Sequence, residues 1–170
     1  MRHTVFAPAW LDELAELRGT LTSAELAEVT AGFVLRPQLW RPLVHHDPSR
    51  RWFERLLLTS MLEVWLIGWA PGQETAVHDH GGSSGGMTVA EGVMAEEIFQ
   101  AAEPAEGRAE IRPHVVATGR RVTLTPGVPV GFPEARVHRV RNGGPENATS
   151  VHAYSPPGRA LREYVEARQR

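Results

Sequence analysis

The sequence predicts an all-β domain with α-helices at its N-terminus. From about residue 54 to about residue 157, short apolar stretches recur at intervals of about eight to twelve residues and are separated by glycine, proline and other turn residues. This spacing is typical of an antiparallel barrel or sandwich. The preceding segment, about residues 8–50, carries apolar residues at helical spacing and is predicted to form a helical cap.

Two helices are expected in this cap. The run from Leu11 to Leu17 has apolar residues at helical spacing, and Gly19 follows it as a stop signal. A second helix can begin at Thr22 or Ser23, because a hydroxyl residue is a common N-cap, and Glu25 follows at its start. Further apolar residues at helical spacing then extend this second helix.

Eight strands are expected in the barrel, each ended by turn residues such as Thr118-Gly119 and Pro126-Gly127. Trp65 and Trp69 lie on apolar strand faces and are expected in the core. The tail from residue 158 to residue 170 is predicted to form one or two helical turns. The expected strands are 62–69, 75–80, 87–92, 95–100, 111–117, 121–124, 136–141 and 149–154.

Length and composition limit the possible functions. A chain of 170 residues fits one domain, here 1–170, and can bury about 70% of its unfolded surface. With 18 basic and 20 acidic residues the net charge is -2, which provides no basic face for nucleic acid. Cysteine is absent, which excludes disulfides and thiolate ligands, and no apolar run has membrane-spanning length. We expect a soluble, cytoplasmic monomer that acts on a small molecule, without nucleic-acid or membrane partners.

Three histidines form a candidate metal site. His78 and His80 are one residue apart, so in a strand they project to the same face, while Asp79 points the other way. His138 lies on a late strand, which closure of the barrel can bring opposite the first pair. Three protein ligands leave coordination positions open, as in a reactive metal site. Imidazole suits zinc, iron, nickel and copper alike, so the ligands leave the metal open.

The residues around these histidines resemble the two cupin motifs, which implies a double-stranded β-helix, or jelly-roll-like, barrel. Many cupins carry a glutamate ligand where this chain has Gly85, so the site is all-histidine. A smaller departure is Ala135, which stands where a glycine is usual. The matching positions are Gly72, His78, His80 and Gly92 in the first motif, and Gly127, Pro133, His138 and Asn142 in the second.

A cupin with three histidines and no glutamate ligand resembles the cysteine dioxygenase family, in particular its bacterial type I thiol dioxygenases. This resemblance implies a non-haem iron(II) enzyme that transfers both atoms of O2 to the sulfur of a small thiol, without an organic cosubstrate. It extends over about residues 53–157. The matching stretches are Phe53-Glu54-Arg55, His78-Asp79-His80-Gly81-Gly82-Ser83, His138-Arg139-Val140-Arg141-Asn142 and Ser150-Val151-His152-Ala153-Tyr154-Ser155-Pro156-Pro157.

Alternation places Ser150, His152 and Tyr154 on one face of a late strand. A relay follows: Ser150 fixes one ring nitrogen of His152, His152 fixes the phenol of Tyr154, and the phenol reaches the space beside the metal. The family has a similar catalytic triad, whose tyrosine contacts substrate and oxygen. Animal members can crosslink that tyrosine to a cysteine. The matching position here is Gly85, so Tyr154 is expected to act as an ordinary phenol.

Arg55 corresponds to the arginine that, in cysteine-specific relatives, binds the substrate carboxylate. A guanidinium suits this task because its planar fork binds a carboxylate through two hydrogen bonds. Arg159 is a second candidate. The resemblance favours L-cysteine, and 3-mercaptopropionate stays open because it also carries a carboxylate. The competing hypotheses are a zinc or nickel cupin with a hydrolase, isomerase or ligand-binding role, and a cupin sensor without catalysis.

Overall fold

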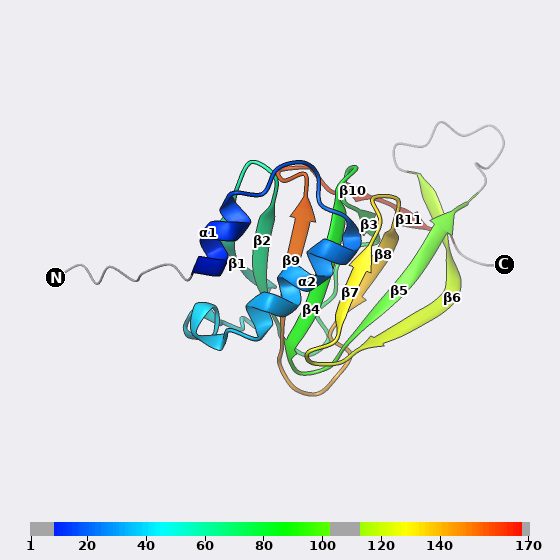
Figure 1. Cartoon of the computed structure of the whole chain (residues 1–170). Helices are drawn as coiled ribbons and strands as arrows, with labels where there is room; N and C mark the ends of the chain where they lie inside the picture. The colour runs from blue at the N-terminus through cyan, green and yellow to red at the C-terminus, as the bar shows by residue number, and fades with distance from the viewer. Residues whose placement is uncertain (1–8, 103–112, 168–170) are drawn as a thin grey trace.

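The computed structural model describes residues 9–102 and 113–167 (Figure 1). Helices α1 (Ala9–Ala15) and α2 (Ser23–Val34) come first, followed by the 3-10 helices η1 (Pro37–Leu39) and η2 (Arg41–Leu43). The rest of the described chain is built from strands. They are β1 (Trp52–Leu58), β2 (Glu63–Trp69), β3 (His78–Asp79), β4 (Ser84–Glu91), β5 (Met94–Ala101), β6 (His114–Leu124), β7 (Pro129–Phe132), β8 (Val137–Arg141), β9 (Ala148–Ser155), β10 (Arg162–Glu163) and β11 (Val165–Glu166).

The strands form two sheets. One has the order β1-β2-β9-β4-β7, and the other has the order β10-β3-β8-β5-β6-β11. Pairing is antiparallel except between β11 and β6. Because neighbours in each sheet come from distant parts of the sequence, early and late strands lie side by side (Figure 1). The all-β prediction with N-terminal helices is confirmed.

Helix α2 lies against the sheet that contains β4, β7 and β9 (Figure 1). It starts as predicted: the Thr22 hydroxyl accepts a hydrogen bond from the Glu25 amide, and the Glu25 carboxylate accepts one from the Thr22 amide at 2.7 Å. The close approach of helix and strand requires glycine at position 86, because a Cβ there would stand 2.4 Å from the Leu26 carbonyl carbon. The helix thereby covers one face of the sheet and leaves the opposite face for the site.

Most predicted strands are present, with three differences. The stretch 75–80 contributes only the two residues of β3. The predicted strands 111–117 and 121–124 form one strand, β6, which continues through the expected turn at Thr118-Gly119; residues 111 and 112 lie outside the described ranges. A register shift between Glu97 and Phe99 of β5 accommodates the additional residues of β6 as a bulge. Strands β1 and β7 were not among the expected strands.

The predicted helical tail is wrong for the described residues after 158. This segment instead forms the short strands β10 and β11, which pair with β3 and β6 at the edges of the second sheet. Its residues satisfy their backbone groups by strand pairing, so local helical propensity does not decide the conformation. Residues 168–170 lie outside the described ranges.

The core lies partly under the helices and partly between the sheets. Phe33 and Trp40 from the cap pack with Leu62, Leu66 and neighbouring side chains, all of them buried. A second buried cluster includes Trp69, as predicted, whereas Trp65 is only partly buried and lines a cavity. None of the helices in the described residues has the length and apolar character that a membrane crossing requires.

Candidate active site

The structure brings the three candidate ligands together. Strand β3 pairs with β8 so that His78 lies directly opposite His138, and His80 follows β3. All three side chains are buried, and their candidate ligand nitrogens lie within 4.8 Å of one another. The Nε2 atoms of His80 and His138 are 3.4 Å apart. Three ring nitrogens therefore face one small space, as a shared metal ion requires.

Two of the three rings are oriented by groups behind them. His78 Nδ1 is 2.9 Å from the Ala76 carbonyl oxygen, and His138 Nδ1 is 2.8 Å from a Glu96 carboxylate oxygen. Both partners can only accept, so each Nδ1 carries the proton and each Nε2 presents its lone pair to the shared space. Glu96 is itself held by Arg136 at 2.9 Å. Among the described residues, His80 Nδ1 is buried without a hydrogen-bond partner.

Burial keeps the imidazoles of His78 and His80 neutral. Burial lowers the pKa of His78 to about 4, and the neighbouring His138 contributes to the same effect. Burial also lowers the pKa of His80 to about 2, again with a contribution from His138. At neutral pH both rings are therefore uncharged, and a neutral imidazole is the form that binds a metal. The residues present thus fit a divalent metal held by three histidines.

A hydrogen-bonded chain runs along β9 toward the same space. Trp69 Nε1 donates to Ser150 Oγ at 2.9 Å, Ser150 Oγ is 2.8 Å from His152 Nε2, and His152 Nδ1 is 3.2 Å from the Tyr154 hydroxyl. The indole can only donate, so the Ser150 hydroxyl proton is free to point at His152 Nε2. The ring then carries its proton on Nδ1 and donates it to the Tyr154 oxygen. The chain therefore leaves the Tyr154 proton available to the cavity.

Tyr154 lies beside the metal ligands. Its ring stacks on His80 with centroids 4.9 Å apart. Burial, reinforced by the charge of Glu63, raises the pKa of Tyr154 above its ordinary value, so the phenol stays protonated at neutral pH. Gly85 pairs with Tyr154 across β4 and β9, and a Cβ at Gly85 would stand 2.0 Å from the Phe132 ring. Phe132 thus fills the space that a side chain at position 85 would need.

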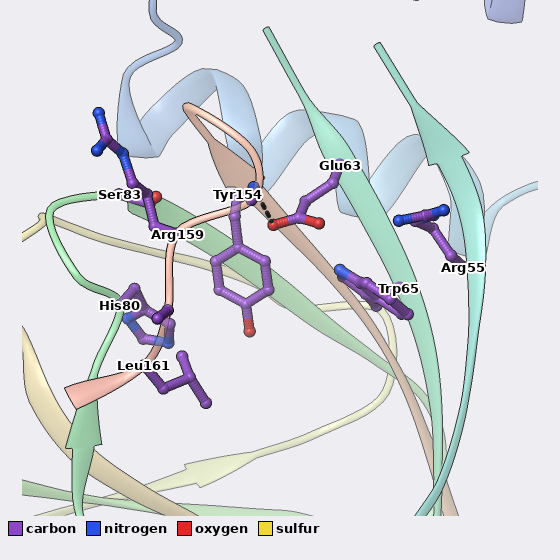
Figure 2. Close-up of a pocket in the computed structure, with 10 residues that line it drawn as sticks. Arg55, Glu63, Trp65, His80, Ser83, Tyr154, Arg159 and Leu161 are labelled. Atoms are coloured by element: carbon purple, nitrogen blue, oxygen red, sulfur yellow. Dashed lines mark hydrogen bonds between the residues drawn. The ribbon is translucent and has the colours of Figure 1, made fainter. Parts of the chain in front are cut away.

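Two cavities meet at Tyr154. The outer cavity, about 480 Å³, is lined by Arg55, Trp65, His80 and Tyr154, together with Glu63 and Arg159 (Figure 2). The Arg55 guanidinium lies over the Trp65 ring, 5.4 Å from its centroid. The inner cavity, about 120 Å³, is lined by His78, His138, His152, Tyr154 and Arg51. Leu161 lines both cavities.

Asp79 fastens the C-terminal segment beside these cavities. Its buried carboxylate accepts hydrogen bonds from Arg162 Nη2 at 2.7 Å, from the Tyr164 hydroxyl at 2.5 Å and from the Gly81 amide at 2.8 Å. These hydrogen bonds lower the pKa of Asp79 against the opposing effect of burial. Asp79, which alternation places on the opposite side of the strand from His78 and His80, therefore binds the C-terminal segment. This segment carries Leu161, which lines both cavities.

Three contributors to the site were missed at the sequence level. Arg51 stands four residues before Arg55, and strand alternation alone could have placed both on the same face. Trp69 was assigned to the core, although a buried indole N–H usually needs an acceptor. Glu96 had no local signal, because its role depends on the pairing of β5 with β8, which places Ile98 opposite His138.

Comparison with known proteins decides the family. A model of the cysteine dioxygenase type I family matches residues 10–167. The chain belongs to this family. Membership in the cysteine dioxygenase type I family implies a dioxygenase activity. The three-histidine group is consistent with that activity and with metal binding.

Solved structures similar to this family member show its fold. An uncharacterised protein with a double-stranded β-helix domain from Klebsiella pneumoniae is 22% identical, with a TM-score of 0.55 over 73% of this chain and 87% of that one. TT1209 from Thermus thermophilus is 21% identical, with a TM-score of 0.50 over 68% and 92% of the two chains. A cupin 2 conserved barrel protein from Leptotrichia buccalis is 14% identical, with a TM-score of 0.50 over 68% and 45%. The fold is therefore a cupin, the double-stranded β-helix.

Proposed function

We propose that this member of the cysteine dioxygenase type I family is an iron(II)-dependent thiol dioxygenase acting on a small thiol carboxylate, with L-cysteine as the favoured substrate. The proposal is supported mainly by one observation: the three histidines and the hydrogen-bonded chain that ends at Tyr154 lie beside each other. His78, His80 and His138 converge on one point, and Tyr154 stacks on His80 with its hydroxyl at the end of a directional hydrogen-bonded chain. We also propose that the protein acts as a cytoplasmic monomer.

The reaction needs no organic cosubstrate. A thiol, R–SH, and one O2 give the sulfinic acid, R–SO2H: two sulfur–oxygen bonds form, the O–O bond breaks, and sulfur supplies the four electrons that reduce O2. An iron(II) ion at the three histidines would supply open coordination positions and favour loss of the thiol proton. Both oxygen atoms remain in the product, so no second reductant is required.

The chain's own residues orient the reactants and hold one proton. Tyr154 keeps its proton at neutral pH, because burial and Glu63 raise its pKa, and it can donate a hydrogen bond to an oxygen or sulfur atom in the cavity. His152 and Ser150 fix the direction of that hydrogen bond from behind. Burial lowers the pKa of His152 to about 3, so this ring stays neutral. Because the Ser150 hydroxyl donates to Nε2, the ring proton is on Nδ1, on the side of Tyr154.

Oxygen uptake by the iron-loaded protein tests the proposal. With L-cysteine or 3-mercaptopropionate we expect one O2 consumed per thiol, and a product that carries two labelled oxygen atoms when the reaction is run under ¹⁸O2. Tyr154→Phe is expected to lower kcat by roughly 10²-fold, the lower range for loss of a positioned proton donor. Absence of O2 uptake with every thiol of a small panel would overturn the proposal.

Metal analysis separates the zinc or nickel hypotheses from this one. Imidazole ligands do not choose between these metals, so protein expressed without added metal is to be analysed for all of them. We expect activity to follow the iron content. Near-stoichiometric zinc, together with a catalytic activity that does not respond to iron, would support a hydrolase or isomerase instead.

A further inference from the structure

We propose that Leu161 limits the length of the thiol that the site accepts, because its side chain separates the outer cavity from the point at which the three histidines meet. This assignment rests on the proposed function, since it takes the sulfur to be held at the histidines. It goes beyond that function by naming the residue that excludes longer thiols. Three features of Leu161 support it: its place between the two cavities, its exposure, and the contacts that fix its backbone.

Leu161 stands at the boundary between the two cavities. Of the described residues, Tyr154 and Leu161 line both of them. The candidate ligands are divided between the cavities, since His80 lines the outer one whereas His78 and His138 line the inner one. The point that the three ring nitrogens face therefore lies where the cavities meet. Figure 2 shows the Leu161 side chain on the His80 side of Tyr154, toward the hydroxyl end of the ring.

The two cavities differ in the length of molecule that they can hold. The inner cavity has a volume of about 120 Å³ and the outer cavity one of about 480 Å³. A protein cavity of about 150 Å³ holds benzene, so the inner cavity has room for about five or six non-hydrogen atoms. A three-carbon mercapto acid is of that size when its sulfur lies at the histidines. A longer thiol has to extend its chain into the outer cavity, past Leu161.

The exposure of Leu161 indicates that the residue acts at the cavities and not in the core. It is 57% exposed, and it belongs to none of the buried hydrophobic clusters formed by the described residues. A leucine side chain has no hydrogen-bonding group, so it acts on a bound thiol only by contact and by the space that it occupies. Leu161 can therefore discriminate between thiols by their size.

The backbone on both sides of Leu161 is fixed. Before it, the Ala160 carbonyl lies against Gly81, where an added Cβ would stand 2.2 Å from the carbonyl oxygen. After it, Arg162 of β10 pairs with Asp79 of β3 and also binds the Asp79 carboxylate. A side chain whose backbone is held at both neighbours keeps its position when a ligand arrives, which a limit on ligand length requires.

Kinetics with a series of mercapto acids test the assignment in the iron-loaded protein. 3-Mercaptopropionate, 4-mercaptobutyrate and 6-mercaptohexanoate differ only in the number of methylene groups. For the wild type we expect kcat/KM to fall along the series, by roughly 10- to 200-fold from the shortest to the longest, the range for a chain that the pocket does not accommodate. Leu161→Ala removes the branched end of the side chain. It should raise kcat/KM for 6-mercaptohexanoate at least about 10-fold and change that for 3-mercaptopropionate less than about 3-fold.

Two further variants serve as controls. Leu58→Ala is the matched control, because Leu58 is 52% exposed and lines neither cavity, and it should leave the dependence on chain length unchanged. Leu161→Met keeps the volume of the side chain and should keep the wild-type dependence. Both leucines are exposed, so these substitutions are expected to leave folding intact.

Two kinetic results would overturn the assignment. One is an equal change in kcat/KM for all three mercapto acids in Leu161→Ala, which would indicate a general effect on the C-terminal segment. The other is a wild type that uses 6-mercaptohexanoate as well as it uses 3-mercaptopropionate, since no limit on length would then exist.

Anaerobic binding separates this assignment from the proposed function. Titration calorimetry under nitrogen, with the iron-loaded protein, compares 3-mercaptopropionate with 6-mercaptohexanoate without turnover. We expect the wild type to bind the shorter thiol at least about 10-fold more tightly, and Leu161→Ala to reduce this preference to less than about 3-fold. If the preference is found and the variant loses it, but neither protein consumes O2, the proposed function fails while the assignment stands. An equal preference in wild type and variant, or no binding of either thiol, overturns the assignment.

Discussion

The contact between Trp69 and Ser150 gives a quantitative prediction about the hydrogen-bonded chain. Ser150→Ala leaves two buried groups without partners: the Trp69 Nε1–H, which donates at 2.9 Å, and His152 Nε2, which lies at 2.8 Å. Each orphaned group costs about 1–3 kcal/mol, so the free energy of unfolding should fall by about 3 kcal/mol. Trp69→Phe removes the donor itself. In the double variant the orphaned donor no longer exists, and the loss should be about 1–2 kcal/mol smaller than the sum of the single losses.

Urea unfolding of the metal-free protein measures this coupling through a double-mutant cycle. Trp40→Phe is the matched control, since Trp40 is buried and its Nε1 has no hydrogen-bond partner among the described residues. Its cost should add to that of Ser150→Ala within about 0.5 kcal/mol. Additivity of the same quality between Trp69→Phe and Ser150→Ala would refute the direction that we assign to the chain.

Three further predictions concern the metal ligands, the packing and the response to pH. Glu96→Gln removes the charge behind His138 and should weaken metal binding about 10- to 100-fold, measured by competition with a chelator; unchanged affinity would contradict the role of the carboxylate. Gly86→Ala should destabilise the protein by about 1–3 kcal/mol in urea, because the new Cβ meets the backbone of α2; a neutral result would show that α2 can shift. In the metal-free protein, His152 has a folded pKa of about 3, so below pH 6.5 the unfolded chain binds a proton that the folded chain does not. Stability should therefore fall by about 1.4 kcal/mol per pH unit for this residue as the pH decreases from about 6 to 4, and a flat profile over that range would contradict its burial.

Local patterns predicted the fold class and much of the site. The alternation in His78-Asp79-His80 is a property of the strand backbone, and it survives although β3 is only two residues long. The capping box of α2 is equally local, since Thr22 and Glu25 are three residues apart. Features of this kind depend on neighbouring residues alone, which is why one sequence suffices to predict them.

The remaining features depend on contacts between distant segments. Thr118-Gly119 carries a turn signal, and Gly119 does adopt a positive φ of 76°, but the chain forms a bulge there because β6 pairs with β5 on both sides of it. The C-terminal residues form strands because the edges of the second sheet provide partners. Arg51 and Trp69 belong to the site only because the first strand folds beside the second, with Phe53 opposite Ile67. The residues that pair with each strand lie far away in the sequence, so local patterns do not predict them. Where strand pairing and the local preference for a turn or helix disagree, the pairing decides the conformation.

The attachment of the C-terminal segment to Asp79 also bears on the order in which the site is completed during synthesis. All three histidines precede residue 139, whereas Arg162 and Tyr164, which bind the Asp79 carboxylate, follow later in the chain. Until β10 has paired with β3, the segment that carries Leu161 is not held beside the cavities. The wall of both cavities is therefore completed by the last strands of the chain, after all three histidines have been made.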